Sequence, residues 1–422
     1  MDRRSFLQGA AAISTFTILK PQAVFGYKAN AAIRMGIIGC GGRGTTVLTA
    51  MSENTNIHII AIADLFEDQI QQALPKFNSL NTKKGLTDVP KSNLYKGSKA
   101  YLKLLDNKNV DAVLISSPSY THPQFFEAAV AAGKHVYCEK PAAIDVAGCK
   151  NVKRVGEKIN SRLSSVFGFE IRHATPYMEM VKRIHRGDIG EVVNGQLFYL
   201  ASQIPVRNFR NMKSDEAIVR NHYQFEKLCG GILTEQAIHM LDVCNWALKA
   251  HPDSAMGTGG NKGGPPYGDT LRNYQLIYQY PEDIKVSLHA TQFGSYWGDV
   301  CAKFIGTKGT AEAHYSGGVF INGENPWDSG VARGTEELTA EQKAAGIFLS
   351  SLQDADPNKV KAFINSIETG KYLNEAQSCA ESTLSAIMGR NAVKAGKAVT
   401  WDHVAASNEN IEHGINLSQF DK

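Results

Sequence analysis

Residues 33–44 of this 422-residue chain read Ile-Arg-Met-Gly-Ile-Ile-Gly-Cys-Gly-Gly-Arg-Gly. The stretch is a short apolar segment followed by the pattern Gly39-x-Gly41-x-x-Gly44, and we expect a helix to follow it. In a strand–turn–helix context, the first glycine permits a tight turn and the second lets the backbone approach a pyrophosphate. The third glycine lets the helix pack closely on the strand. The stretch therefore predicts a dinucleotide-binding turn at the start of a parallel sheet.

The second predicted strand, Ile57–Ala63, ends at Asp64, 25 residues after Gly39. An acidic residue near this offset binds the adenosine ribose in dinucleotide-binding folds. A carboxylate at that position repels a 2′-phosphate, so the sequence favours NAD over NADP as the cofactor.

The elements on both sides of this stretch predict two α/β domains. Strands at 110–116 and 135–138 alternate with a helix at 122–132, and residues 78–98 are expected to form a surface loop. This alternation is typical of a doubly wound parallel sheet, a Rossmann domain over residues 33–170. Residues 171–422 are predicted to form a second α/β domain with an open, mainly antiparallel sheet. Its strands are expected at 192–200, 273–280, 285–291 and 300–306, its helices at 360–368 and 375–394, and a loop at 257–268.

Two groups of residues carry the predicted chemistry. Glu139-Lys140-Pro141 follows the fourth strand, and ligands of parallel sheets bind beyond the carboxyl ends of strands. A lone lysine is usually a solvated surface residue. At a strand end, however, Lys140 could take the hydroxyl proton of an alcohol as a hydride leaves the alcohol carbon. Glu235, His239 and Asp242 are spaced four and three residues apart, which predicts one helix face on which Glu235 orients His239. A metal site and a purely structural network are the alternatives for this trio, and no third or fourth ligand indicates a metal.

The first 32 residues resemble an export signal. Arg3-Arg4 precedes Phe6-Leu7 and an apolar run to about Leu19, and small residues follow. We interpret residues 1–32 as a twin-arginine signal, which exports folded proteins, and an ordinary basic signal is the alternative. The protein is therefore expected in the periplasm or otherwise outside the cytoplasm. The net charge of +4, without a basic stripe, argues against nucleic acid, and seven scattered cysteines argue against a disulfide framework.

With these motifs, the chain resembles the glucose–fructose oxidoreductase / inositol dehydrogenase (Gfo/Idh/MocA) family, in an exported subgroup. The resemblance rests on residues 110–122, 132–141, 306–310 and 381–390, besides the glycine stretch. It implies a catalytic lysine at Lys140, a catalytic histidine at His239, and last helices that pack back on the first domain. It also implies dimers or tetramers built through the open sheet.

These motifs and the resemblance together give the predicted site. Cofactor binding is assigned to Gly39, Gly41, Gly42, Arg43, Gly44, Asp64, Ser117, Pro118, His122, Glu139 and Lys140. Catalysis is assigned to Lys140, His239 and Glu235, substrate binding to Arg172, Arg220, Asn221 and Asp242, and no metal is expected.

The expected function is NAD-dependent oxidation of a sugar, glycoside or polyol hydroxyl. Because no free cofactor pool exists outside the cytoplasm, the cofactor is expected to be loaded before export and tightly bound. The alternative is redox-neutral glycoside cleavage through a 3-keto intermediate, in which NAD is recycled. A third hypothesis is a non-catalytic sugar sensor. The expected partners are a carbohydrate, the twin-arginine export machinery and further copies of the chain.

Overall fold

In the computed structural model, which describes residues 32–159, 162–294, 298–331 and 350–421, the glycine-rich stretch forms a strand, a turn and a helix. Strand β1 (Ile33–Ile38) is buried over its last four residues, and helix α3 (Gly42–Asn54) begins inside the glycine-rich stretch that it was expected to follow. The predicted signal segment, residues 1–32, lies outside the described residues apart from Ala32.

The first sheet has six strands in the order β3-β2-β1-β4-β5-β6, and every neighbouring pair is parallel. The chain starts at the centre, extends to one edge and then returns to the other, so the strand order reverses between β1 and β4. In such sheets, ligands bind beyond the carboxyl ends of the strands at this reversal. The predicted doubly wound parallel sheet is confirmed. Its elements are β2 (Ile57–Asp64), α4 (Glu67–Lys83), β3 (Leu94–Lys96), α5 (Ala100–Asp106), β4 (Ala112–Ile115), α6 (His122–Ala131), β5 (His135–Cys138), α7 (Val146–Glu157) and β6 (Ser165–Phe167).

The predicted surface loop at 78–98 is wrong in part. Helix α4 continues to Lys83, and β3 adds an edge strand to the sheet. The polar surface of this segment conceals the helix, because only a stripe formed by Ile70, Ala73, Phe77 and Leu80 is buried.

The second sheet has nine strands in the order β14-β13-β12-β11-β7-β10-β9-β8-β15, and only the β7–β10 pair is parallel. This confirms the predicted open, mainly antiparallel sheet, although β8 begins before and enters the segment predicted as a loop. Its strands are β7 (Val192–Leu200), β8 (Ser254–Gly260), β9 (Asn273–Gln279), β10 (Lys285–Thr291), β11 (Val300–Gly306), β12 (Gly309–His314), β13 (Val319–Gly323), β14 (Trp327–Asp328) and β15 (Val399–Thr400).

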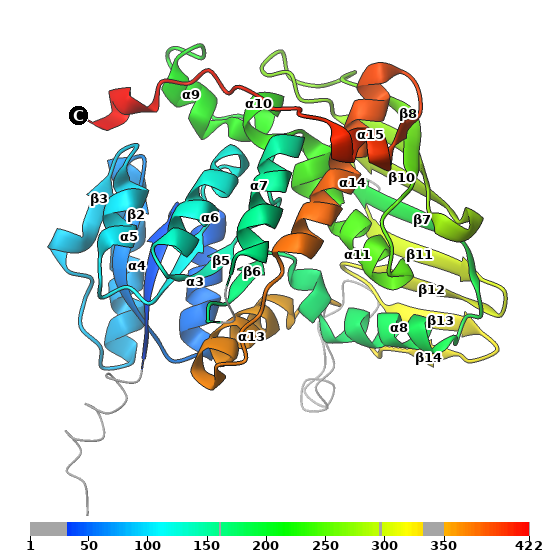
Figure 1. Cartoon of the computed structure of the whole chain (residues 1–422), viewed down its shortest axis with the longest axis horizontal. Helices are drawn as coiled ribbons and strands as arrows, with labels where there is room; N and C mark the ends of the chain where they lie inside the picture. The colour runs from blue at the N-terminus through cyan, green and yellow to red at the C-terminus, as the bar shows by residue number, and fades with distance from the viewer. Residues whose placement is uncertain (1–31, 160–161, 295–297, 332–349, 422) are drawn as a thin grey trace, which may run out of the picture.

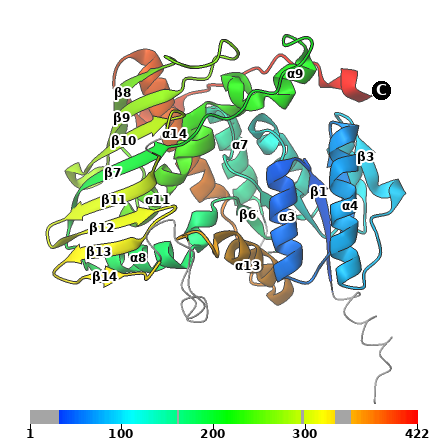
Figure 2. The ribbon, with the colours of Figure 1, turned by 180° about the vertical axis from the view of Figure 1, so that it is seen from behind.

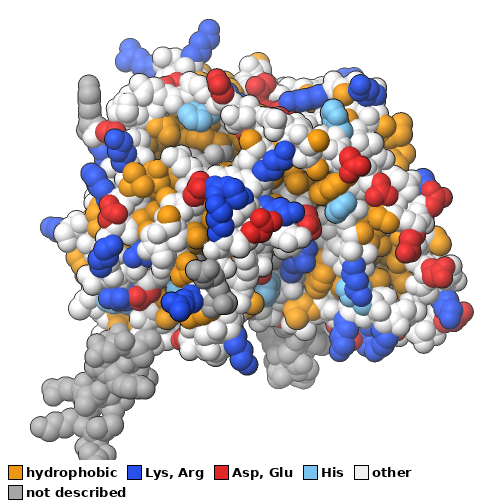
Figure 3. Space-filling model, viewed as in Figure 1, with side chains coloured by type: hydrophobic (Ala, Val, Ile, Leu, Met, Phe, Trp, Pro, Cys, Tyr) orange, Lys and Arg blue, Asp and Glu red, His pale blue; other side chains and the backbone are white. Residues whose placement is uncertain are grey.

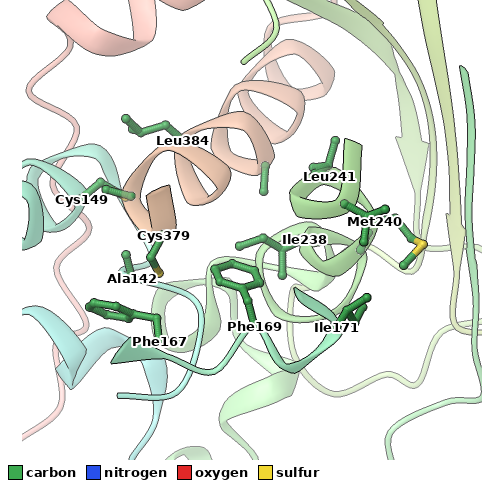
Figure 4. Close-up of a cluster of buried hydrophobic side chains, with 14 of the residues drawn as sticks. Ala142, Cys149, Phe167, Phe169, Ile171, Ile238, Met240, Leu241, Cys379 and Leu384 are labelled. Atoms are coloured by element: carbon green, nitrogen blue, oxygen red, sulfur yellow. The ribbon is translucent and has the colours of Figure 1, made fainter. Parts of the chain in front are cut away.

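Helices fill the space between the two sheets (Figures 1 and 2). Figure 4 shows side chains of β6, α7, α11 and α14 meeting in one apolar cluster, with Phe167 and Phe169 beside Ile238 and Cys379. The last helices contact the Rossmann sheet and its helices; for example, Ala142 N donates to Thr383 Oγ1. The remaining helices are α8 (Thr175–Arg186), α9 (Asp215–Arg220), α10 (Glu226–Cys229), α11 (Ile238–Leu248), α13 (Ala355–Thr369), α14 (Ala376–Ala395) and α15 (Trp401–Ala406).

The surface carries basic and acidic side chains interspersed with one another over the face seen in Figure 3. All seven cysteines are buried as free thiols. Among the described helices, none is long and apolar enough to cross a membrane.

The glycine stretch offers a matched pair of substitutions. A Cβ at Gly44 would lie 2.3 Å from the carbonyl oxygen of Gly39, whereas a Cβ at Gly42 would meet nothing within 4 Å. We expect Gly44→Ala to lower the free energy of unfolding by about 1–3 kcal/mol, because the overpacked helix must shift. Gly42→Ala is expected to leave it unchanged or raise it by up to about 1 kcal/mol, since alanine favours helix. Urea denaturation of the cofactor-free protein checks this, and equal effects of the two substitutions would contradict the packing role of Gly44.

Candidate active site

A pocket of about 600 Å³ lies beyond the carboxyl ends of β1, β2, β4 and β5. This volume is typical of small-molecule and cofactor sites, which span roughly 300–1,000 Å³. The structure thus brings the glycine turn, Lys140 and His239 to one cavity. The predicted residues that line it are Gly39, Gly41, Gly42, Arg43, Asp64, Ser117, Pro118, His122, Glu139, Lys140, Arg220, Glu235 and His239.

The glycine turn presents bare backbone to this pocket. Gly39 has a φ of +87°, and a Cβ there would lie 2.7 Å from the backbone of Ser116 and Ser117. Positions 41 and 42 are open, and helix α3 starts without a side-chain cap among the described residues. The first N–H groups of a helix are free to bind an anion when no cap satisfies them. The turn therefore fits the pyrophosphate of a dinucleotide.

Asp64 lines the pocket at the end of β2 and also holds the turn in place. Its carboxylate accepts hydrogen bonds from Cys40 N at 2.9 Å and from Phe66 N at 3.0 Å. Burial raises its pKa, and these two N–H groups oppose that shift. The Asp64 carboxylate thus connects the glycine turn to the loop after β2, in addition to its predicted role in binding the ribose.

Lys140 enters the pocket from the loop after β5. Its Nζ donates to the backbone carbonyl of Glu235 and lies 3.9 Å from Glu235 Oε2. Ser119 Oγ donates to the other carboxylate oxygen, Oε1. Burial raises the pKa of Glu235, an effect that Lys140 opposes. Glu235 therefore fixes the position of the Lys140 ammonium within the pocket.

His239 is buried, at 6 % exposure, and lines the same pocket. Its Nδ1 is buried and has no hydrogen-bond partner among the described residues, and its Nε2 lies 3.9 Å from Glu170 Oε1. Burial lowers the pKa of His239 well below its ordinary value, and the neighbouring cations Lys140 and Arg43 act in the same direction. The imidazole is therefore neutral near pH 7 and can accept a proton.

The predicted orientation of His239 by Glu235 is wrong. The carboxylate near His239 is Glu170, whereas Glu235 contacts Ser119 and Lys140. Residues Leu233–Ala237 form a π-helical turn before α11. The wider turn changes the angular offset between residues four apart, so the α-helical spacing rule does not apply.

Arg43 compensates a group of buried acids in the pocket wall. Its Nε donates to Glu139 at 2.9 Å, its Nη1 and Nη2 donate to Asp356 at 2.8 and 2.9 Å, and Glu170 lies at 3.8 Å. Burial raises the pKa of both Glu139 and Glu170, and Arg43 lowers it again. Arg43 thus links α3 to α13. All three nitrogens of its guanidinium already donate to carboxylates, although a cofactor phosphate would need them as donors.

Arg172 and Asp242, predicted to bind substrate, do not line this pocket. They form a two-hydrogen-bond ion pair at 2.8 and 2.9 Å, and Ser382 Oγ donates to Asp242 at 2.7 Å. Arg172 lines a separate cavity of about 310 Å³ with Trp246. Helix α11 points Asp242 toward α14. The predicted substrate-binding role of Arg172 and Asp242 is therefore wrong, and the two residues form a structural contact between helices.

Arg220 and Asn221 also differ from the predicted substrate role. Arg220 lines the part of the pocket over β2, where it binds Asp68 and Glu216. Asn221 is buried at 4 % exposure, and its side-chain amide binds backbone groups of Arg207 and Ala217. Neither arrangement was visible in the sequence, because Asp68 is 152 residues away from Arg220.

One further predicted residue, His122, braces the pocket. The ring nitrogens of His122 lie 2.7 Å from Pro141 O and 2.9 Å from Ser117 O, and burial lowers the pKa of His122. His122 thereby joins the loops that follow β4 and β5, the strands whose ends carry Pro118 and Lys140.

Glu170, which no predicted motif includes, lines the pocket beside His239. It follows the end of β6 as Glu139 follows β5, so the strand-end rule applied to β6 would have found it. A trio of potential metal ligands, Asp299, Cys301 and His314, lies on the nine-stranded sheet and does not line the pocket.

Comparison with protein families places both halves of the chain. Residues 33–167 match the model described as "Oxidoreductase family, NAD-binding Rossmann fold", and residues 177–312 match a "GFO/IDH/MocA C-terminal domain". The chain is 27 % identical over 219 residues to inositol 2-dehydrogenase of Salmonella typhimurium, covering 51 % of this chain and 54 % of that protein. The chain thus spans about half the length of this curated relative. With the Rhizobium meliloti inositol 2-dehydrogenase it shares 23 % identity over 80 % of this chain and 89 % of that protein.

Solved structures share the fold. Scyllo-inositol dehydrogenase of Lactobacillus casei, with bound NAD(H) and scyllo-inositol, superimposes with a TM-score of 0.65 at 20 % identity, covering 87 % of this chain and 99 % of that one. Aldose-aldose oxidoreductase of Caulobacter crescentus, complexed with glycerol, gives a TM-score of 0.65 at 17 % identity over the same shares.

Proposed function

Because the chain belongs to the GFO/IDH/MocA family of oxidoreductases, we propose that it is an NAD-dependent oxidoreductase that acts on a sugar, glycoside or polyol hydroxyl. One observation carries the proposal: Lys140 and His239 line the pocket that the glycine turn opens onto. The inositol dehydrogenases and the aldose-aldose oxidoreductase to which the chain is similar support this substrate class.

NAD fits the residues of the pocket. The uncapped start of α3 and the open positions at Gly41 and Gly42 offer room and N–H donors for a pyrophosphate. The carboxylate of Asp64 disfavours a 2′-phosphate, which favours NAD over NADP. When bound, NAD supplies the hydride acceptor, the nicotinamide ring.

The residues around the nicotinamide end divide the remaining work. His239, neutral because its pKa is lowered by burial, accepts the hydroxyl proton at Nε2, the nitrogen beside Glu170. Lys140, held by the Glu235 carbonyl, binds the same substrate oxygen. It thereby positions the C–H bond of the carbon that carries this oxygen for hydride transfer. Glu170 and Arg43 retain the charge balance of the buried wall as the proton arrives.

Export and tight cofactor binding belong to the same proposal. A twin-arginine signal in residues 1–32 carries the folded protein, with NAD loaded in the cytoplasm, to the periplasm or beyond. Seven buried free thiols suit a protein that folds in a reducing compartment before export. Reduced cofactor is then reoxidised in place, by a second carbonyl substrate or another electron acceptor.

We also propose a homo-oligomer built through the open face of the nine-stranded sheet. In the described part of the chain, helices cover only the face toward the Rossmann domain (Figures 1 and 2). The open face carries exposed Met256 and Ile277, and partly exposed Phe198 stacks on His289 there.

The test offers glucosides and polyols to the purified protein and follows absorbance at the NADH band. A lasting NADH signal with a 3-keto product supports the oxidoreductase. Free aglycone without net NADH would instead support redox-neutral glycoside cleavage. Neither signal, together with unchanged sugar affinity in Lys140→Ala, would leave only the sugar sensor.

A further inference from the structure

Two segments remote in sequence from the Rossmann sheet close the part of the pocket over β2. They are helix α9 and the tail that follows α15, which crosses the molecule and ends beside β3 (Figures 1 and 2). The tail is fixed at its start, where Ile411 N donates to Asp145 at 2.8 Å and Ala147 N donates to Glu409 O at 2.9 Å. Residues 413–421 then reach the Rossmann loops.

Arg220 of α9 binds the first turn of α4, through Asp68, and the loop after β2, through Phe66. Its guanidinium donates two hydrogen bonds to Asp68, at 2.7 and 2.9 Å, and lies 3.8 Å from the ring centre of Phe66. Although Asp68 is half-exposed, the Arg220 side chain is only 12 % exposed. An ion pair combined with a cation–π contact on a shielded arginine is more persistent than a surface pair alone.

The tail binds the neighbouring loop after β3. Asp421 accepts hydrogen bonds from Ser98 N at 2.6 Å and from Ser98 Oγ at 2.9 Å, and Phe420 meets the Phe66 ring edge-on at 5.2 Å. Leu417 lines the pocket itself. The tail and Arg220 therefore meet at Phe66.

The tail and α9 are also joined to each other. Asp215 accepts hydrogen bonds from Asn416 N and from Gln419 Nε2, at 3.2 and 2.7 Å. An apolar cluster of Val219, Leu228 and Ile415 packs against residues of the pocket rim. The partly buried residues in contact with it are Leu65, Phe66, Tyr120, Ile218, Phe225 and Leu417, and the first three and Leu417 line the pocket.

We propose that α9 and residues 413–421 form a clamp that retains the adenosine half of NAD through repeated turnovers. The proposal rests on the proposed function, because Asp64 and the glycine turn place the ribose of a bound dinucleotide beneath these segments. Release of the nucleotide then requires that Arg220 leave Asp68 and that the tail leave Ser98. Such a clamp makes NAD a resident group, as a site outside the cytoplasm would need.

The test is a chase of bound NADH, followed by its fluorescence, after excess NAD is added. Arg220→Ala, Asp421→Asn and a chain lacking residues 413–422 are expected to release NADH faster than the unchanged protein by about 10-fold or more, because changes at a binding surface act mainly on dissociation. Arg154→Ala, which removes an exposed ion pair between α7 and Glu127 of α6, is the matched control and is expected to release NADH at the unchanged rate.

The fold of each variant is checked by circular dichroism and by its unfolding transition. Asp421 is exposed, so Asp421→Asn is expected to keep the fold and to isolate the clamp even where the shortened chain is unstable. Release rates within about 2-fold of the unchanged protein in both point variants, with NADH bound, would overturn the clamp and leave the proposed function standing. A protein that binds no NADH at all would overturn the two together.

Discussion

Replacing Lys140 with alanine is expected to lower kcat by about 10²- to 10³-fold, the usual cost of removing one donor that binds the reacting oxygen. The ammonium lies inside the pocket, held by the Glu235 carbonyl, and no other lysine lines that pocket in the described part of the chain. Bound nucleotide is expected to remain, because the glycine turn and the β2 end hold it elsewhere. Steady-state kinetics together with the NAD content of the purified protein measure both quantities.

A second variant separates two roles of this residue. Lys140→Arg keeps a positive charge that cannot be given up at any accessible pH. Recovery of most of the activity by arginine would mean that charge alone suffices, whereas continued loss indicates that the shape or the proton of the lysine matters. Lys76→Ala, on the exposed side of α4, is the matched control and is expected to be neutral. Lys140→Ala with kcat within a few-fold of the unchanged protein would contradict its catalytic assignment.

His239→Gln is expected to lower kcat to a similar extent, about 10²- to 10⁴-fold. Glutamine fills the space and keeps a polar group but cannot accept the substrate proton. Because the pKa of His239 is lowered by burial and by Lys140 and Arg43, the neutral ring persists below pH 6.5. The unchanged enzyme is therefore expected to keep its activity as the pH falls through that value. A pH profile of kcat that declines with a midpoint at or above 6.5 would contradict this environment for His239.

The same shift has a consequence for stability. As pH falls below the ordinary histidine pKa, the unfolded chain takes up a proton that buried His239 does not, so the free energy of unfolding decreases. The largest slope for one such group is about 1.4 kcal/mol per pH unit. His239→Gln removes this contribution, and urea denaturation of the two proteins between pH 7 and pH 5 measures the difference.

The fold could be predicted from the sequence because its strands are apolar runs with clear turn signals. Strands β7, β10 and β11 begin and end where the alternation of polar and apolar residues predicts. The surface elements α4 and β3 were missed, since most of their residues are polar and only a narrow stripe of α4 is buried.

The site could be predicted only where local rules hold. Strand ends correctly place Asp64 and Lys140 at the pocket, and the family resemblance correctly places His239 there. Helix spacing predicted the wrong partner for Glu235, because a π-helical turn intervenes between Glu235 and His239. It also predicted the wrong direction for Asp242, which α11 turns toward α14. The sequence did not reveal that Arg172 pairs with Asp242 or that Arg220 pairs with Asp68, because these partners are 70 and 152 residues distant and long-range ion pairs leave no local signal.

The central claim is that this pocket moves a hydride between a carbohydrate hydroxyl carbon and bound NAD. Deuterium transfer is its most direct test. The purified protein with its nucleotide is incubated with fully carbon-deuterated glucose or myo-inositol, and the recovered nicotinamide is analysed by mass spectrometry. The account predicts deuterium at C4 of the nicotinamide in the unchanged protein, and its appearance at least about 10²-fold more slowly in Lys140→Ala. Absence of deuterium with every carbohydrate offered, or equal transfer in the Lys140 variant, would contradict it.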